Sequence, residues 1–434
     1  MILKLLNSNQ KNFIQKLELI LKKRKVNRSS KSLLVKKIIS DVIKNKDQAL
    51  IKYENKFSKF NKIKKKDIKF SNKEINTTIK KLDKKTKNAI DLAFNRILRF
   101  HKNQKIKPFK IKDNLKNIFS YTSSPIEKVG VYVPGGTAIY PSSVLMNCIP
   151  AMIAGVNEIY MTTPTNKDTY NPAVLYAAKK CKVKEIYKIG GAQAIAALAY
   201  GTKIVKKVNK IVGPGNEFVA LAKKEVFGDV GIDMIAGPSE VTVVADNSSR
   251  PDWVASDLIA QAEHDKFSQS ILIANNKNII NHVNICLKKQ LKNLKRKNIA
   301  LDSLKTFGLS ILVKNRNMIS KIINTIAPEH LEICTKKPEK ILNKVSNAGS
   351  IFIGNYSPEA MGDYLAGTNH VLPTSGAAKF SSGLSVYDFL KRHSIIKISK
   401  SGIERLGTSV INLSKYENLD GHAYSVKIRL KRKN

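Results

Sequence analysis

The sequence of 434 residues has little of several features that mark specialised classes of protein. It has four cysteines, and none lies in a CxxC pair, so a disulfide scaffold is excluded and free thiols in a reducing compartment are expected. It has no run of about 18 apolar residues, so we expect no membrane span. The apolar run after Met1 is too short for a signal peptide. These absences together predict a cytoplasmic protein.

Acidic residues are also scarce: 33 Asp and Glu stand against 77 Lys and Arg, which gives a formal net charge of +44. Such an excess can indicate a nucleic-acid or anionic-membrane partner. However, no helix-turn-helix, RNP or zinc-finger pattern is present. The excess is largest in residues 1–115, where 34 Lys and Arg stand against nine Asp and Glu and are interleaved with apolar residues at helical spacing. We therefore interpret it as lysine on solvated surfaces, and we expect neither a specific nucleic-acid partner nor a membrane.

The apolar pattern predicts an α/β fold. From about residue 128, short apolar runs alternate with helical segments, which is typical of βαβ units and parallel sheets. We expect two Rossmann-like parallel-sheet domains, without the usual GxGxxG fingerprint, plus a helical N-terminal region and a small C-terminal tail domain. The expected divisions are a helical, basic region over 1–120 that packs partly on the second α/β domain, a first α/β domain over 121–236, a second over 237–380, and the tail over 381–434.

Three expected strands of the first α/β domain each end in a glycine turn before a helix, at Gly135-Gly136, Gly190-Gly191 and Gly213-Pro214-Gly215. Glycine lets backbone N–H groups approach an anion at a helix N-terminus, and ligands of open α/β sheets bind at the carboxyl ends of strands. Any one of these turns taken alone is more often just a turn. Together they make a nucleotide crevice plausible.

Four of the seven histidines lie in lysine-poor segments that also contain acidic residues: His264, His330, His370 and His422. We expect the other three, His101, His282 and His393, at the surface. On a helix, Gln261 and His264 would share a face and could hold a metal ion, although a solvated helix end is the alternative. Adjacent Glu329 and His330 cannot point the same way on a regular element, which suits two separate proton transfers; a capped helix start is the alternative.

The motifs around these residues resemble those of the histidinol dehydrogenase family over essentially the whole chain. They are VYVPGG at 131–136, GGAQAIAALAYGT at 190–202, KIVGPGN at 210–216, IAGPSE at 235–240, AQAEHD at 260–265, APEHLE at 327–332 and GDYLAGTNHVLPTSGAAKFSSGLSV at 362–386. Their joint occurrence in this order is far more specific than any one of them.

The resemblance implies an NAD-dependent alcohol and aldehyde oxidoreductase that requires zinc. It would perform the last step of histidine biosynthesis, the four-electron oxidation of L-histidinol to L-histidine through bound L-histidinaldehyde, with two NAD+ and one Zn2+ per subunit. The region 121–236 would bind NAD and 237–380 would bind substrate and zinc. The tail over 381–434 would reach the active site of the partner subunit, so the resemblance implies a homodimer with shared active sites.

The resemblance also assigns roles to individual residues. His330 would remove the hydroxyl proton, and Glu329 would activate water. The expected metal ligands are Gln261, His264, Asp363 and His422. The expected substrate-binding residues are Ser239, Gln261, His264, His330, Asp363, His370, Glu417 and His422. The expected NAD-binding residues are Tyr132, Gln193 and Asn216.

The sequence departs from the family pattern at two places. The tail has Leu419, Asp420 and Gly421 before His422, and Lys266 and Phe267 follow Asp265. Two other functions stay open from the residues alone. A zinc hydrolase could use the same metal ligands with a Glu329 base but would have no need of a dinucleotide crevice, and a nucleic-acid-binding protein is supported by charge alone.

Overall fold

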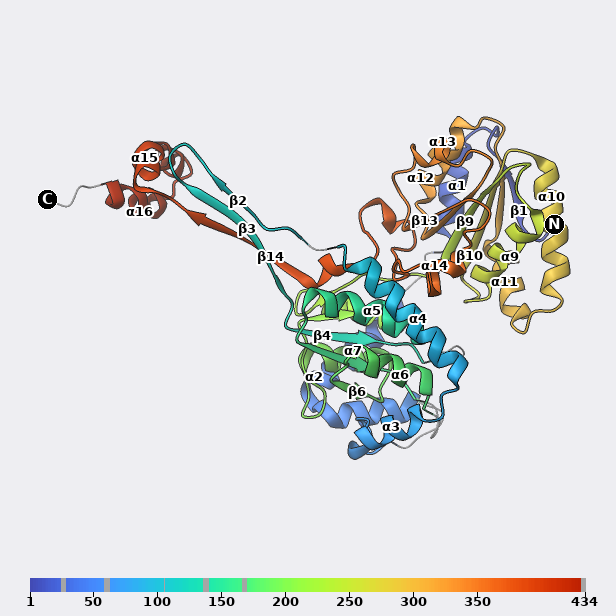
Figure 1. The fold of residues 1–434 in the computed structure, drawn as a ribbon, viewed down its shortest axis with the longest axis horizontal. Helices are drawn as coiled ribbons and strands as arrows, with labels where there is room; N and C mark the ends of the chain where they lie inside the picture. The colour runs from blue at the N-terminus through green and yellow to red at the C-terminus, as the bar shows by residue number, and fades with distance from the viewer. Residues whose placement is uncertain (25–28, 58–62, 105, 136–139, 166–169, 431–434) are drawn as a thin grey trace.

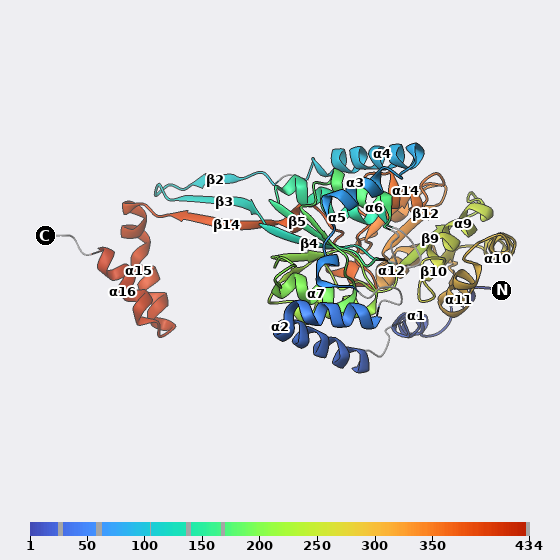
Figure 2. The same cartoon turned by 90° about the horizontal axis from the view of Figure 1, so that it is seen from below.

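The structure, a computed structural model, describes the chain except for residues 25–28, 58–62, 105, 136–139, 166–169 and 431–434. Two α/β lobes lie side by side, and a long arm projects from one of them (Figures 1 and 2). The N-terminus lies on the second lobe, and α16 lies at the far end of the arm. The expected α/β class with parallel sheets is confirmed.

The first lobe is built on a five-stranded parallel sheet in the order β6-β5-β4-β7-β8. Its strands are β4 (Lys128–Tyr132), β5 (Glu158–Thr162), β6 (Glu185–Tyr187), β7 (Lys210–Val212) and β8 (Gly231–Ile232). The helices α7 (Gly191–Tyr200), α8 (Glu217–Val226) and α2 (Ser29–Phe57) share one apolar cluster. The helices α5 (Pro141–Ala154), α6 (Pro172–Lys180) and α4 (Lys84–His101) share the other, and α3 (Asn72–Ile79) packs on α6. The sheet is therefore covered on both faces, as buried parallel sheets require.

Local sequence signals explain where the helices of the first lobe begin and end. The Asn171 side chain accepts hydrogen bonds from the N–H groups of Ala173 and Val174, and Pro172 occupies the first turn of α6. Helix α5 ends at Gly155, whose φ of 90° is accessible to glycine at little cost. These signals place the carboxyl ends of the strands, and the turns that follow them, at one edge of the lobe.

The second lobe is built on a six-stranded parallel sheet in the order β1-β11-β10-β9-β12-β13. Its strands are β1 (Lys4–Asn7), β9 (Glu240–Ala245), β10 (Gln269–Ala274), β11 (Leu309–Leu312), β12 (His330–Cys334) and β13 (Ser350–Ile353). One face is covered by α9 (Pro251–Ala262), α10 (Lys277–Leu291) and α11 (Lys297–Phe307). The other is covered by α1 (Phe13–Lys22) and α12 (Asn317–Ile326), with α13 (Glu339–Leu342) beside them. The short helix α14 (Glu359–Tyr364) follows β13.

The arm joins segments that are far apart in the sequence. Strands β2 (Phe109–Lys112), β3 (Ile118–Pro125) and β14 (Leu390–Lys397) form an antiparallel sheet, with Leu390 opposite Pro125 and Lys397 opposite Ile118. Beyond it, α15 (Lys400–Tyr416) and α16 (Asp420–Leu430) pack together at the end of the arm. Short 3-10 helices, η1 (Lys65–Asp67), η2 (Ala377–Lys379) and η3 (Val386–Phe389), complete the described secondary structure.

The expectation that residues 1–120 are helical is wrong in part. Strand β1 joins the edge of the second sheet, β2 and β3 belong to the arm, and α2, α3 and α4 pack on the first lobe. Strand β3 also crosses the expected boundary at 120. Strand β2 alternates apolar and charged residues (FKIK), but it is only four residues long and fully exposed, so its alternation is too short a signal to reveal the arm.

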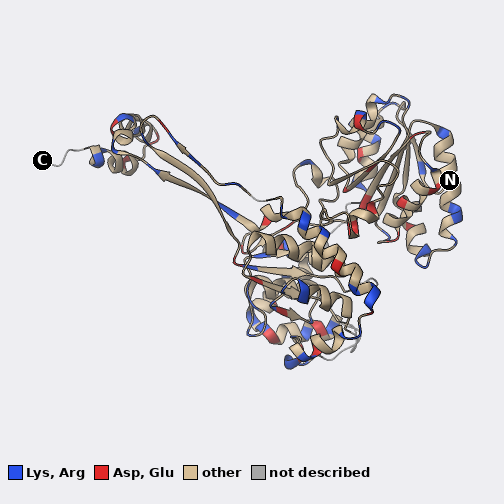
Figure 3. Ribbon diagram, viewed as in Figure 1, with Lys and Arg blue, Asp and Glu red and all other residues tan. Residues whose placement is uncertain are grey.

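Two other expectations also need correction. His101 is completely buried, not at the surface, and its Nδ1 lies 2.7 Å from Gln104 Oε1, because the last turn of α4 faces the core. His330 begins β12, so the APEHLE segment leads into a central strand and does not start a helix. Lysine and arginine are spread over the helices of both lobes and over the arm (Figure 3). Among the described residues, no helix is both long and apolar enough to cross a membrane.

The turn after β7 generates a stability prediction. Gly213 has φ of 112°, and a Cβ atom there would lie 2.1 Å from the Tyr132 carbonyl oxygen. Gly228 has a nearly identical φ of 113°, but a Cβ atom there would meet no described atom within 4 Å. Gly228→Ala should cost about 1–2 kcal/mol through backbone strain, whereas Gly213→Ala should cost about 3 kcal/mol or more, because strain and overpacking add. Denaturant unfolding of both variants measures the difference, and equal losses would contradict the steric argument.

Candidate active site

The expected catalytic pair lies at the start of β12, against the first residue of the neighbouring strand β9. The Glu329 carboxylate accepts a hydrogen bond from the Glu240 N–H at 2.9 Å. The His330 ring donates from Nδ1 to the Glu240 carbonyl oxygen at 3.2 Å. Both side chains are about 5% exposed or less. One residue, Glu240, therefore holds both members of the pair through its main chain.

The expected divergence of Glu329 and His330 is not observed. Glu329 Oε2 lies 3.8 Å from His330 Nδ1, because Glu329 precedes the strand and its side chain turns back toward Glu240. The hydrogen bond from Nδ1 leaves the lone pair of the neutral imidazole on Nε2. His330 Nε2 is buried without a hydrogen-bond partner among the described residues, and it lies 3.8 Å from Asp363 Oδ1. A basic nitrogen thus faces an enclosed polar site.

Burial acts in opposite directions on the two groups. It lowers the pKa of His330 to about 4, so the ring is neutral at neutral pH. Burial raises the pKa of Glu329 well above its ordinary value, and the nearby carboxylates of Glu240 and Asp363 add to the effect. A raised carboxyl pKa makes the carboxylate a stronger base. The site therefore contains two bases whose strengths are set by their surroundings.

Three of the expected metal ligands lie together at this site. Gln261 ends α9, and its amide contacts His264 Nδ1 at 3.1 Å. With its nitrogen turned toward Glu359, Gln261 donates to that carboxylate at 3.2 Å, and its oxygen accepts from His264. This orientation is the stable one because an amide oxygen would find no donor beside a carboxylate. Asp363 comes from α14, and its Oδ1 lies 3.8 Å from His370 Nδ1, which donates to the Asp363 carbonyl oxygen at 3.1 Å.

The donor set is chemically suited to zinc, which binds nitrogen and oxygen ligands. Gln261 supplies an amide oxygen, His264 an imidazole and Asp363 a carboxylate. Within the described part of the chain, no three His, Cys, Asp or Glu side chains form a group that could hold a metal ion. These residues therefore fit part of a metal shell, and a complete shell needs a ligand from elsewhere.

The expected tail residues are not brought to this site within the chain. Glu417 ends α15 and His422 lies in α16, both at the far end of the arm (Figures 1 and 2). Ser239, in contrast, directly precedes Glu240 and so lies beside the catalytic pair. The sheet topology thus gathers the expected residues of 237–380 and leaves those of the tail apart.

The three expected NAD-binding residues lie after the strands of the first lobe. Tyr132 ends β4, and its hydroxyl oxygen accepts from the Gly191 N–H at 3.1 Å. Gln193 is in the first turn of α7, and its amide nitrogen donates to Glu54 at 3.1 Å. Asn216 caps α8 by accepting from the Val219 N–H. The parallel order of β6, β4 and β7 places all three at one edge of the sheet.

The glycine turns of the first lobe differ from the expected anion site. The Gly190 N–H donates to Glu54 at 3.2 Å, and the Gly213 N–H donates to Asp233 at 2.7 Å. Protein carboxylates therefore occupy the places that phosphate oxygens take in a Rossmann turn. The rest of the first junction, residues 136–139, lies outside the described residues. Buried Lys223 forms an ion pair with Asp233, so that charge is neutralised within the protein.

Sequence patterns alone missed the buried carboxylates around the pair. Glu359 is 1% exposed, Glu332 is fully buried, and the Glu332 carboxylate accepts the Glu359 N–H at 2.7 Å. Burial raises the pKa of both, and it raises the pKa of Asp257 to about 6. The signal that could have found Glu332 is its place inside the apolar strand HLEIC, where an unpaired charge would be costly.

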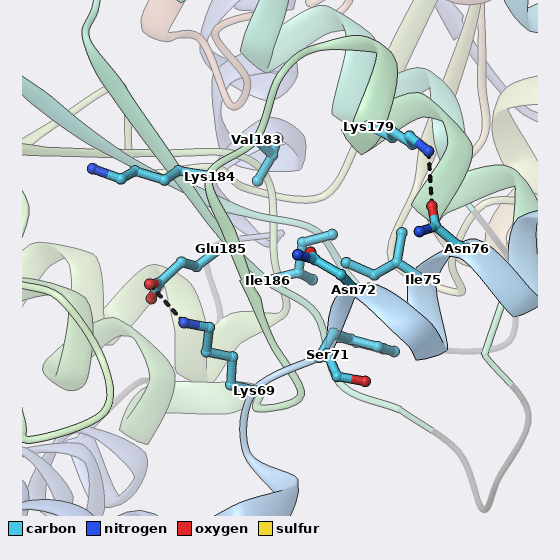
Figure 4. Close-up of a pocket in the computed structure, with 11 residues that line it drawn as sticks. Lys69, Ser71, Asn72, Ile75, Asn76, Lys179, Val183, Lys184, Glu185 and Ile186 are labelled. Atoms are coloured by element: carbon cyan, nitrogen blue, oxygen red, sulfur yellow. Dashed lines mark hydrogen bonds and ion pairs between the residues drawn. The ribbon is translucent and has the colours of Figure 1, made fainter.

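A pocket of about 420 Å³ lies elsewhere, at the amino end of β6 beside α3 (Figure 4). Its lysines already have partners: Lys69 pairs with Glu185 at 2.7 Å, and Lys179 donates to Asn76 at 2.7 Å. Since ligands of parallel sheets bind at the carboxyl ends of strands, this pocket is not the active site.

Comparisons with known proteins agree with this geometry. The histidinol dehydrogenase family model matches residues 21–430. Histidinol dehydrogenase of Pelagibacter ubique is 55% identical over 433 residues, 100% of each chain. That of Clostridium acetobutylicum is 48% identical and covers 92% of each chain. The crystal structure of histidinol dehydrogenase from Elizabethkingia anophelis is 36% identical, superposes with a TM-score of 0.93, and covers 99% of this chain and 98% of its own.

The resemblance seen in the motifs is therefore confirmed across the chain, and it supports the prediction of an NAD-dependent oxidoreductase. The fold, the position of the catalytic pair and the similarity of full-length relatives all lead to one family. This chain belongs to the histidinol dehydrogenase family.

Proposed function

We propose that the protein oxidises L-histidinol to L-histidine through bound L-histidinaldehyde, with two NAD+ and one zinc ion per subunit, as the last step of histidine biosynthesis. The observation that carries this proposal is the pair Glu329 and His330 on the Glu240 peptide, in a chain of the histidinol dehydrogenase family. The two buried bases can serve the proton transfers of a four-electron oxidation with water addition, which removes protons from the alcohol, from water and from the hydrate.

His330 acts as the base of the alcohol step. Its Nε2 accepts the hydroxyl proton as the carbinol hydride leaves to NAD+, which yields the aldehyde. The Glu240 carbonyl fixes the tautomer, since Nδ1–H is donated to it at 3.2 Å. The low pKa of the buried ring keeps Nε2 unprotonated before the step.

Glu329 acts in the aldehyde step. Its carboxylate takes a proton from water as the water oxygen adds to the aldehyde carbon, while His330 returns the proton from the alcohol step to the aldehyde oxygen. The resulting hydrate gives a second hydride to the second NAD+ as His330 takes one of its hydroxyl protons, which leaves the carboxylic acid. The Glu240 N–H holds one carboxylate oxygen at 2.9 Å and leaves the other for the water. Carboxylate bases with raised pKa are effective in such steps.

Gln261, His264 and Asp363 would hold the zinc ion together with His422 of a partner subunit. Bound zinc would orient the substrate and lower the energy of its alkoxide. The support is that Gln261, His264 and Asp363 lie beside the catalytic pair, while His422 lies in α16, on an arm that projects away from its own lobes. We therefore propose a homodimer with shared active sites.

The remaining site residues would bind substrate and cofactor. Ser239 and His370 flank the catalytic pair, and Glu417 would arrive with the partner's arm beside His422. Tyr132, Gln193 and Asn216 would contact NAD+. Because carboxylates occupy two of the glycine turns, NAD+ phosphates would bind away from those N–H groups. We propose no specific nucleic-acid partner and no membrane partner.

The stoichiometry of NADH tests this function directly. We expect two NADH to form for each L-histidinol consumed, as measured by the absorbance of NADH near 340 nm. Treatment with a chelator should abolish turnover, and added zinc should restore it. Consumption of L-histidinol without formation of NADH would show that the proposal is wrong.

Glu329→Gln separates the two half-reactions. The amide is isosteric and can still accept from the Glu240 N–H, but it cannot take a proton from water. Oxidation of histidinaldehyde should fall about 100-fold or more, whereas the alcohol step should stay within about tenfold of the wild-type rate. The exposed Glu339→Gln, nine residues after His330, is the matched control. Equal losses in both half-reactions would contradict the role in water activation.

The cysteines should be dispensable for catalysis. All four are free thiols, and none lies in a catalytic motif, so the aldehyde step does not run through a thiohemiacetal. The hydrogen bond with Cys181, together with burial, raises the pKa of the Cys148 thiol, and burial raises the pKa of the Cys334 thiol, which disfavours the reactive thiolate. Unpaired thiols also fit the proposed cytoplasmic location. A variant with Ser or Ala at all four positions should keep its kcat within about threefold when its circular dichroism is unchanged; a large loss of kcat in that folded variant would refute this.

A further inference from the structure

An arginine from the N-terminal segment reaches the turn that precedes the catalytic peptide. Arg24 lies two residues after the end of α1 and is 6% exposed. Its Nη1 contacts Glu240 Oε2 at 2.5 Å and Gln269 Oε1 at 3.1 Å. Its Nη2 donates to the carbonyl oxygens of Pro238 at 2.7 Å and Ser239 at 3.3 Å. One guanidinium therefore binds three consecutive residues, 238–240.

The residues that Arg24 binds lead straight to the catalytic pair. Glu240 holds Glu329 through its N–H and His330 through its carbonyl oxygen. Its other carboxylate oxygen accepts the Ser375 N–H at 2.8 Å. A shift of the Glu240 backbone would therefore displace both bases together.

We propose that Arg24 is a positioning residue of the reaction: by clamping residues 238–240, it fixes the Glu240 peptide and, through it, the orientation of both Glu329 and His330. Arg24 touches neither catalytic side chain in the described contacts, so it acts through Glu240. This inference rests on the proposed function, because the assay measures the oxidation of L-histidinol.

The chemistry of the contacts favours positioning over simple stabilisation. A buried ion pair adds little net stability, because desolvation of both charges offsets their attraction. The planar guanidinium presents donors in a fixed fork, which lets one side chain bind a carboxylate and two carbonyl oxygens at defined angles. Catalytic groups displaced by about 1 Å can lose about 100-fold in rate. Because removal of Arg24 also leaves the buried Glu240 carboxylate without its ion-pair partner and so destabilises the fold, rescue by guanidinium and the Arg24→Lys variant are needed to separate positioning from stability.

The test compares Arg24→Ala and Arg24→Lys with the wild-type enzyme in full-length, zinc-loaded protein. We expect kcat to fall about 100-fold in Arg24→Ala and about tenfold in Arg24→Lys, with KM for histidinol and zinc content within about twofold of wild type. Millimolar guanidinium should raise the kcat of Arg24→Ala at least tenfold, because guanidinium can occupy the site that the arginine side chain has left. The exposed Arg250→Ala, whose partner is Asp252, is the matched control and should gain nothing from guanidinium.

Several outcomes would overturn the inference. A wild-type kcat in Arg24→Lys would assign Arg24 to stability alone. The same conclusion would follow if Arg24→Ala lost kcat in parallel with a fall in Tm and guanidinium did not restore that kcat. If Arg24→Ala does not fold, the kcat, KM and zinc content of Arg24→Lys decide. The wild-type NADH yield is measured first: its absence would refute the proposed function, whereas normal yield with unimpaired Arg24 variants would refute the positioning role alone.

Discussion

The parallel pairing of β9 with β12 is the constraint on which the active site depends. His330 stands opposite Val241 in this pair, so the Glu240 peptide lies beside the point where β12 begins. Its N–H and its carbonyl oxygen are then free to bind Glu329 and His330, one each. A shift of the register by one residue would turn His330 to the other face of the sheet and remove both contacts. The arrangement of the proposed catalytic pair thus depends on the pairing of the two strands as well as on its own sequence.

The surroundings of this pair carry an electrostatic cost that a purely structural core would avoid. Glu329, Glu332 and Glu359 are buried close to one another, and burial raises the pKa of each carboxyl group. Glu332 Oε2 has no hydrogen-bond partner among the described residues. Natural proteins keep such unfavourable groups mainly at functional sites. The buried carboxylates of β12 and α14 are therefore best explained by the chemistry proposed for them.

The first lobe uses carboxylates in a different way. Glu54 from α2 and Asp233 after β8 bind the N–H groups of the glycine turns, and Lys223 neutralises Asp233. A lobe with the strand order of an open parallel sheet thus lacks free phosphate-binding turns at these two positions. This agrees with the absence of the GxGxxG fingerprint from the sequence. The glycines allow close packing of the backbone at these turns, and carboxylate side chains of the protein bind the N–H groups that a phosphate would otherwise bind.

The sequence by itself determined the α/β class, the alternation of strands and helices after residue 128, and the family, because apolar periodicity and the joint order of the motifs are local properties. It did not reveal the helix α11 or the short strand β8. It also determined that Gln261 lies beside His264, since their spacing places them together at a helix end. Only the tertiary structure decided that β1 joins the second sheet, that β3 pairs with β14, and that Arg24 reaches Glu240 across 216 positions of the chain. Those contacts depend on strand order and on packing between distant segments, which no local pattern encodes. The separation of α16, which carries His422, from the lobes is likewise decided by the geometry of the arm.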